Sequence, residues 1–319
     1  MSTSLVYVTD AEPGISRRRR GRGFSYVAPD GTTIARGAER ARIEALAVPP
    51  AYEDVWICSK ENGHLQATGR DTRHRKQYRY HPQWSAKQAT TKYEQLADFG
   101  EVLPKIRRRV ERDLSNDPGD AEFALAAAVL MIDRAALRVG QQEYTDQNGS
   151  YGALTLRRRH LRIRKDALEL KFTAKGGTKV RKELTDKKLQ KMLHKIQDVE
   201  GATLLSWTDE AGAGQSLSSH QLNNYLTEAS GKDEVTAKTF RTWAGTLAAF
   251  ECAEKGHATI TEIAEAASKR LHNTPSVARN SYIHPAVIAL SGEPPVAITP
   301  LRKSGLFVAE QRLLGLLTR

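Results

Sequence analysis

The sequence predicts an α+β protein: a small antiparallel β-sheet domain, residues 1–86, and a larger, mainly α-helical domain with a β-hairpin, residues 87–319. Three observations lead to this prediction. Short β-prone runs separated by turns fill the region before Trp84, helical patterns dominate after it, and β-prone runs return between residues 151 and 184. A chain of 319 residues is long enough to form two separate cores.

The N-terminal sheet is indicated by breaks between β-prone runs. Pro29-Asp30-Gly31 is a strong turn signal, and the Asn-Gly pair at residues 62–63 is typical of a hairpin. The runs that flank the breaks are Phe24–Val27, Thr32–Ile34, Val55–Ile57 and His64–Thr68. We therefore expect a small antiparallel sheet accompanied by one or two helices.

The second domain combines helices with one hairpin. Lys87–Leu114 has a long, charged, helical pattern, and Ala121–Leu137 is rich in Ala and Leu, which is typical of a buried helix. Leu168–Phe172 and Lys179–Leu184 are β-prone and flank a Gly-Gly pair, so they predict a hairpin. From Leu189 onward the apolar spacing becomes helical again.

The charge balance favours a polyanionic partner. The chain has 49 Lys and Arg against 37 Asp and Glu, a formal net charge of +12. Cations that neutralise phosphates release condensed counterions, and this release drives association with nucleic acid. A basic soluble protein with another role has the same composition, so charge alone leaves both interpretations open.

Several other classes of protein are disfavoured. The two cysteines, Cys58 and Cys252, lie far apart, and no Cys-x-x-Cys or clustered His/Cys spacing indicates a metal site. No apolar signal core or membrane-spanning stretch is found, so we expect a cytoplasmic protein with free thiols. The sequence also lacks a phosphate-binding P-loop, so no nucleotide cofactor is expected, and it lacks a carboxylate cluster for two metal ions.

Basic residues gather in three segments. Arg70–His81 interleaves cations with Gln and Tyr, a composition that suits DNA, because Arg and Lys hold phosphates and Gln can pair with a base edge. Its candidate DNA-binding residues are Arg73, Arg75, Lys76, Gln77, Tyr78 and Tyr80. Arg17–Arg22 is either a solvated arm or a phosphate-contacting segment, and the role of Arg157–His160 stays open.

Two segments near the C-terminus carry candidate catalytic residues. Thr236–Trp243 places Lys238 and Arg241 one turn apart on a predicted helix. Asn273–Pro285 predicts a short helix that presents Tyr282 just before a proline stop. Each residue alone is more often an exposed cation or a core tyrosine, so the functional interpretation depends on the set as a whole.

These motifs together resemble the type IB DNA topoisomerases of the bacterial and poxvirus-like kind. The resemblance extends over nearly the whole chain, and its motifs occur in the family's order. They are Pro49–Cys58, Gly63–Asp71, Arg75–Tyr78, Leu137–Gly140, Ser150–Gly152, Phe172–Lys175, Thr236–Thr242 and the Tyr282 segment.

The resemblance implies a catalytic set. Arg138 and Arg241 match the arginines that hold the non-bridging oxygens of the scissile phosphate. Lys175 matches the general acid that protonates the leaving 5′-oxygen, and Tyr282 matches the nucleophile that forms a 3′-phosphotyrosyl bond. Asn273 stands where relatives often have His, and its amide can donate a hydrogen bond but cannot transfer a proton.

Further expectations follow from the same resemblance. His272, one position before Asn273, is not the matching residue, and Lys238 is expected to contact DNA. The substrate would be supercoiled double-stranded DNA, clamped between the two domains by a monomer that needs neither ATP nor a divalent ion. A tyrosine recombinase is the nearest alternative, although Lys238 stands in a Lys-x-x-Arg pattern where recombinases usually have His-x-x-Arg. A non-catalytic DNA-binding protein is the second alternative.

Overall fold

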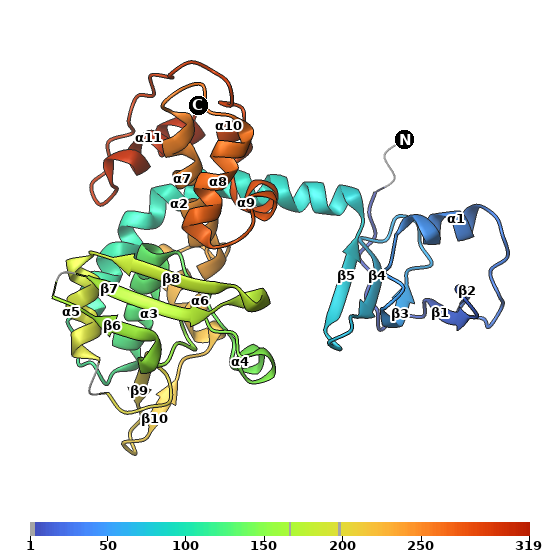
Figure 1. The fold of residues 1–319 in the computed structure, drawn as a ribbon, viewed down its shortest axis with the longest axis horizontal. Helices are drawn as coiled ribbons and strands as arrows, with labels where there is room; N and C mark the ends of the chain where they lie inside the picture. The colour runs from blue at the N-terminus through green and yellow to red at the C-terminus, as the bar shows by residue number, and fades with distance from the viewer. Residues whose placement is uncertain (1–3, 166, 197–198) are drawn as a thin grey trace. The chain divides into compact units, whose positions relative to one another are not determined.

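The structure is a computed structural model that describes residues 4–165, 167–196 and 199–319 (Figure 1). The chain divides into two compact units, Met1–Lys92 and Tyr93–Arg319. Sequence analysis places the domain boundary after residue 86, and in the structure that position lies inside helix α2 (Pro82–Asp113). The prediction of an α+β fold, with an N-terminal antiparallel sheet and a mainly helical remainder, is confirmed.

The first unit is built on a five-stranded sheet in the order β2-β1-β3-β4-β5, in which all neighbouring strands are antiparallel. Its strands are β1 (Ile15–Arg20), β2 (Gly23–Val27), β3 (Glu53–Ile57), β4 (Leu65–Arg70) and β5 (Lys76–Tyr80), joined by helix α1 (Ala38–Ala45). The run predicted at Thr32–Ile34 forms only an isolated bridge, between Val27 and Thr33. Ile15, Ile43 and Ile57 are almost fully buried in the core of this unit.

The basic segment Arg17–Arg22 is not a free arm, because most of it forms β1. The Arg17 guanidinium donates to the carbonyls of Val48 and Pro49 at 2.9 Å, and to that of Tyr52 at 2.7 Å. It also lies over the Phe24 ring, 4.2 Å from the ring centroid. At least this arginine therefore stabilises the unit.

The second unit packs helices around a small sheet. Its strands are β6 (Leu161–Ile163), β7 (Leu168–Thr173) and β8 (Lys179–Leu184), with a separate hairpin of β9 (Ser206–Thr208) and β10 (Gly214–Ser216). Besides most of α2, its helices are α3 (Ala121–Ala135), α4 (Gln142–Asn148), α5 (Lys187–Lys195), α6 (Ser219–Ser230), α7 (Ala237–Ala253), α8 (Ile260–Leu271), α9 (Pro275–Tyr282), α10 (Pro285–Ile288) and α11 (Val308–Leu317). The predicted hairpin is present as β7 and β8.

Helix α7 is the central element of this unit, and it packs against α8, α9 and α3. Its Trp243 indole donates to Glu310 of α11 at 3.2 Å. Glu310 and Asp133 of α3 both pair with the Arg107 guanidinium of α2, at 2.7 and 2.9 Å, so four helices meet at one buried polar network. In the part of the chain that the structure describes, no helix is long and apolar enough to cross a membrane.

Candidate active site

The first arginine of the site follows α3, where the chain makes a tight crossing. Ala136 ends the helix in the left-handed conformation, with φ of 50°. The Arg138 carbonyl then accepts a hydrogen bond from the Ala153 amide at 2.8 Å. A Cβ on Gly152 would lie 2.5 Å from the same carbonyl oxygen, so only glycine fits there. The Leu137–Gly140 and Ser150–Gly152 motifs therefore pack on each other and fix the backbone at Arg138.

The second arginine, Arg241, lies on the buried face of α7 and is only 4% exposed. Its guanidinium donates to the carbonyl of Ala136 and, at 3.1 Å, to that of Leu271. Its Nε is buried without a hydrogen-bond partner. Burial, reinforced by the charge of Arg138, lowers the pKa of Arg241 to about 10. The arginine therefore remains charged at neutral pH, held by carbonyls rather than by a carboxylate.

Tyr282 is the last residue of α9, which begins with Pro275 after a Thr274 cap. The ring centroid of Tyr282 lies 5.4 Å from the Arg241 guanidinium carbon. Two features of α7 set this position. The Thr246 hydroxyl donates to the Tyr282 carbonyl at 3.0 Å, and a Cβ on Gly245 would lie 2.9 Å from that carbonyl oxygen.

The turn after α8 brings His272, rather than Asn273, into the arginine cavity. Arg138, Arg241 and His272 line one small cavity between α3, α7 and α8. Burial and the surrounding cations lower the pKa of His272 to about 4, so its imidazole is neutral at physiological pH. Both polar atoms of the Asn273 side chain are buried without a hydrogen-bond partner. The sequence pattern does not single out His272, because only the left-handed turn at this residue, with φ of 49°, reveals where it points.

Lys182 of β8 is the other residue in this cavity that sequence analysis missed. It is 8% exposed, and its ammonium group donates to the Arg270 carbonyl at 2.9 Å. A signal was present in the sequence: Lys182 stands between Val180 and Leu184 in a strand whose alternate residues face the core.

The two other lysines predicted for the site do not line this cavity. Lys175 lies in the short turn between β7 and β8, where it is exposed. Lys238 is exposed in the first turn of α7. The structure therefore groups Arg138, Arg241 and Tyr282, and leaves both lysines at the surface.

Apart from Lys238, the predicted DNA-binding residues lie on and just before the edge strand β5. Tyr78 and Tyr80 are 50% and 46% exposed, and their rings stack in parallel with centroids 6.1 Å apart. Lys76 forms a salt bridge with Asp10 at 2.5 Å, and Arg73 is exposed in the preceding turn. This arrangement offers cations and two aromatic faces side by side.

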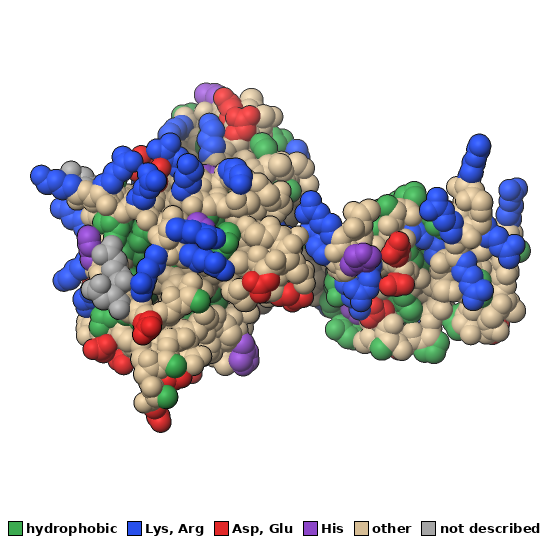
Figure 2. Space-filling model, turned by 60° about the horizontal axis from the view of Figure 1, so that its bottom comes forward, with side chains coloured by type: hydrophobic (Ala, Val, Ile, Leu, Met, Phe, Trp, Pro, Cys, Tyr) green, Lys and Arg blue, Asp and Glu red, His purple; other side chains and the backbone are tan. Residues whose placement is uncertain are grey.

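Asp71 organises this surface and was not singled out from the sequence. Its carboxylate accepts from the Arg75 guanidinium at 2.7 Å and from the Gln77 amide at 3.0 Å, and it also accepts from the backbone amide of Arg73. The hydrogen bond from Arg75 is the largest cause that lowers the pKa of Asp71 to about 2. One carboxylate thus holds two candidate DNA contacts in place. Lys and Arg side chains also gather over the upper part of the visible face of the second unit (Figure 2).

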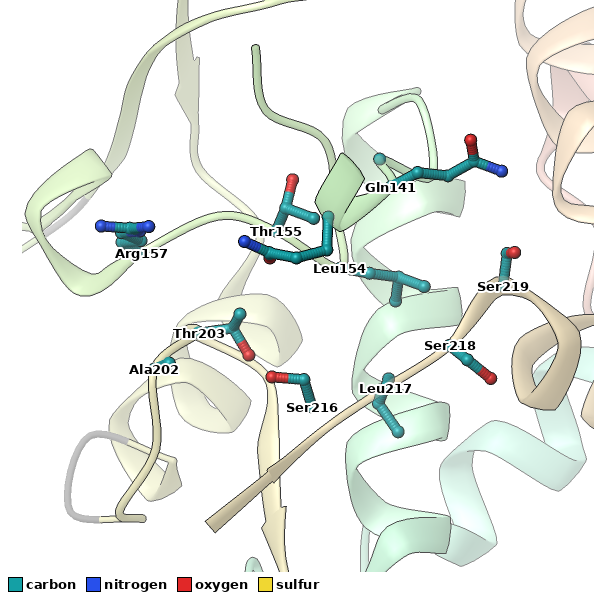
Figure 3. Close-up of a pocket in the computed structure, with 12 residues that line it drawn as sticks. Gln141, Leu154, Thr155, Arg157, Ala202, Thr203, Ser216, Leu217, Ser218 and Ser219 are labelled. Carbon is teal, nitrogen blue, oxygen red and sulfur yellow. The ribbon is translucent and has the colours of Figure 1, made fainter. Parts of the chain in front are cut away.

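A separate cavity of about 350 Å³ lies where the starts of α4 and α6 approach the segment after Arg138 (Figure 3). Hydroxyl groups of Thr155, Thr203 and Ser218 are among its lining groups, and Arg157 is the charged residue among those that line it. It shares no lining residue with the arginine cavity. Within the described ranges, no group of three or more His, Cys, Asp and Glu residues is placed to hold a metal ion.

Comparison with known proteins identifies the family of the chain. A family model described as "Eukaryotic DNA topoisomerase I, catalytic core" matches residues 77–279, and one described as "Bacterial DNA topoisomerase IB, N-terminal domain" matches residues 23–71. The DNA topoisomerase 1B of Acanthamoeba polyphaga mimivirus is 29% identical over 289 residues, 85% of each chain. The DNA topoisomerase 1B of vaccinia virus (strain Copenhagen) is 26% identical over 150 residues, 46% of each chain. Since the first model spans more than half of the sequence, the chain belongs to the type IB DNA topoisomerase family.

Proposed function

We propose that this protein relaxes supercoiled double-stranded DNA by the type IB reaction. Tyr282 attacks a backbone phosphate, a 3′-phosphotyrosyl bond forms, and the strand with the free 5′-hydroxyl rotates before it reseals the break. The observation that carries the proposal is the placement of Tyr282 beside Arg241, which lines one cavity together with Arg138.

The two arginines supply the electrostatic part of this mechanism. As the phenol oxygen adds to phosphorus, negative charge accumulates on the non-bridging oxygens. Arg241 is held rigidly by two carbonyls, so its charge needs little reorganisation when the phosphate arrives. Fixed donors of this kind are worth about 10²–10³ in rate each.

The leaving 5′-oxygen needs a proton, and we assign this role to Lys175. Its exposed position on the β7–β8 turn lets the side chain approach bound DNA. Lys238, also exposed, contacts the backbone of the duplex in this proposal. In this proposal Asn273 binds and orients the scissile phosphate by a hydrogen bond from its amide. It does not transfer a proton, because an amide is neither an acid nor a base at neutral pH.

The β5 surface binds the duplex by phosphate contacts from Arg73, Arg75 and Lys76, while Gln77 and Tyr78 contact bases or sugars. Tyr80, stacked on Tyr78, completes this surface. Torsional strain in the substrate drives the reaction, so neither ATP nor a divalent ion is needed. As the family resemblance implies, we expect the protein to act as a monomer. Its place would be the cytoplasm, associated with the nucleoid.

The decisive experiment is relaxation of negatively supercoiled plasmid in the presence of EDTA and without ATP. We expect relaxation by the natural protein and none by Tyr282→Phe, which should still bind the plasmid. A covalent complex trapped with detergent should carry its protein on the 3′ end of the nick. Relaxation by Tyr282→Phe would refute the assignment of the nucleophile, and tight binding without relaxation by either protein would favour a non-catalytic DNA-binding protein.

A further inference from the structure

Lys182 occupies a position that its strand pattern reserves for apolar residues. Val180, Lys182 and Leu184 share one face of β8, and the residue opposite Lys182 on β7 is Leu170. Only 8% of the lysine is exposed. Lysine is almost never buried this deeply unless it has a partner, so a specific interaction must stabilise Lys182 in this position.

The partner of Lys182 is the end of helix α8. Its amine donates to the carbonyl of Arg270 at 2.9 Å, and Arg241 donates to the next carbonyl, that of Leu271, at 3.1 Å. Carbonyls in the last turn of a helix carry partial negative charge, so they suit cations. Lys182 and Arg241 are therefore anchored side by side at one helix end, and both line the cavity that contains Arg138.

The charged groups around Lys182 are almost all positive. They are Arg138 after α3, Arg241 of α7 and Arg270 of α8. His272, in the turn after α8, is neutral. On the same face of β7 lie only apolar residues, whereas Glu169 faces away and pairs with Arg181 at 2.7 Å. Asp133 of α3 acts on Arg270 and is itself paired with Arg107. In the described ranges, no salt bridge joins a carboxylate to Lys182.

A buried amine in such surroundings is costly to charge, because desolvation and like charges both oppose protonation. Burial, followed by the charges of Arg270 and Arg241, lowers the pKa of Lys182 to about 7. An anion bound beside Arg138 and Arg241 reverses the balance, since it attracts the ammonium form and offsets the charge of the arginines.

We propose that Lys182 is an additional cation of the phosphate site, which takes up a proton when a DNA phosphodiester binds beside Arg138 and Arg241. The proton comes from solvent, and no covalent bond changes. The proposal rests on the proposed function, because it needs a phosphodiester that binds against Arg138 and Arg241. Its consequence is a site that is less strongly charged when empty than when DNA is bound.

The test measures proton uptake during DNA binding, separately from the chemical step. A short duplex is titrated calorimetrically into the Tyr282→Phe protein, in buffers of different ionisation enthalpy. We expect uptake that approaches one proton per duplex at about pH 8 and disappears below about pH 6, where the lysine is charged in both states. Duplex affinity should accordingly fall by up to about tenfold per pH unit above neutrality.

Two variants assign the proton to Lys182. Lys182→Gln keeps a donor for the Arg270 carbonyl but cannot titrate, and Lys182→Arg stays charged, so both should lose the uptake at about pH 8. His272→Asn is the matched control, because it removes the histidine that lines the same cavity and should leave this uptake unchanged. Asparagine also tolerates the left-handed backbone of this residue.

The outcomes separate the two proposals. Duplex binding by Tyr282→Phe without proton uptake at about pH 8 would overturn the role of Lys182 and leave the proposed function intact. Uptake that persists in Lys182→Gln would overturn it as well. Failure of the Tyr282→Phe protein to bind any duplex would overturn both. Because the first measurement uses the natural Lys182, it decides the question even if the substituted proteins fold poorly.

Discussion

The two units hold their positive charge in opposite ways. On the β5 surface of the first unit, cations are partly exposed and paired with carboxylates: Lys76 with Asp10 at 2.5 Å, and Arg75 with Asp71 at 2.7 Å. In the cavity of the second unit, Arg241 and Lys182 are buried and donate to backbone carbonyls. Exposed ion pairs exchange partners at little cost, whereas the buried Arg241, held by carbonyls, keeps an uncompensated charge. The first arrangement suits reversible binding of DNA, and the second suits stabilisation of charge that develops during a reaction.

Replacement of Arg241 by Ala should have the largest effect and should act on chemistry rather than binding. We expect single-turnover DNA cleavage to slow by about 10²–10³, because a fixed donor to the developing phosphorane charge is removed. The matched control is Arg79→Ala on β5, since Arg79 also donates to a carbonyl, that of Ala47 at 3.1 Å, but is exposed. Arg79→Ala should weaken binding and leave cleavage of bound DNA unchanged. Equal losses of cleavage in both variants would remove the contrast between the two units.

Gly245→Ala should have the next largest effect, because it disturbs the position of Tyr282 without touching a charge. The added Cβ would lie 2.8 Å from the Leu271 side chain and 2.9 Å from the Tyr282 carbonyl oxygen. Overpacking of this kind typically costs about 1–3 kcal/mol. We expect a lower free energy of unfolding in urea and slower cleavage, with unchanged duplex affinity.

The control for this change is Ala248→Gly on the same helix. It removes a methyl group instead of adding one, and it should cost at most about 1 kcal/mol through helix propensity alone. Its cleavage rate should equal that of the natural protein. If Gly245→Ala also cleaves DNA at the natural rate, the close approach of α7 and α9 does not set the position of the nucleophile.

The sequence was sufficient for those parts of the site that depend on local pattern. The α+β class and the β7–β8 hairpin follow from spacing and turn residues. Arg138, Arg241 and Tyr282 lie in ordered motifs, and the structure brings them together.

What the sequence left undetermined depends on tertiary contacts. Arg17 had no visible partner in the sequence, because the carbonyls that it contacts lie 31 to 35 residues away. His272 enters the cavity only through the left-handed turn after α8. The sequence shows that Lys182 interrupts an apolar alternation, but it does not show what surrounds the lysine. The cations around Lys182 come from three other segments, and only the fold brings them together.

Removal of cations from the β5 surface should change binding without affecting chemistry. For the double variant Lys76→Ala and Arg79→Ala, we expect the slope of log affinity against log salt to shrink by about 0.9 for each phosphate that the protein no longer neutralises. Arg40→Ala is the control, since Arg40 is engaged with Glu44 on α1 at 2.9 Å, and its salt slope should not change. A double variant with the natural salt slope would exclude β5 as a phosphate-binding surface.

The smallest expected effect concerns Asp71, whose lowered pKa favours its charged form, whereas the lowered pKa of Lys182 favours the neutral amine. Hydrogen bonds from Arg75 and from backbone amides lower its pKa to about 2 in the folded protein, against about 3.9 in an unfolded chain. A carboxyl group whose pKa is lowered by folding stabilises the fold at pH values above its pKa in the unfolded chain. This contribution disappears as the pH falls through its pKa in the folded protein. Urea unfolding should therefore show Asp71→Asn to be less stable than the natural protein at pH 7, with a difference that shrinks below about pH 4. A difference that stays constant down to about pH 2 would mean that the carboxylate acts through its shape, because an effect of its charge must titrate.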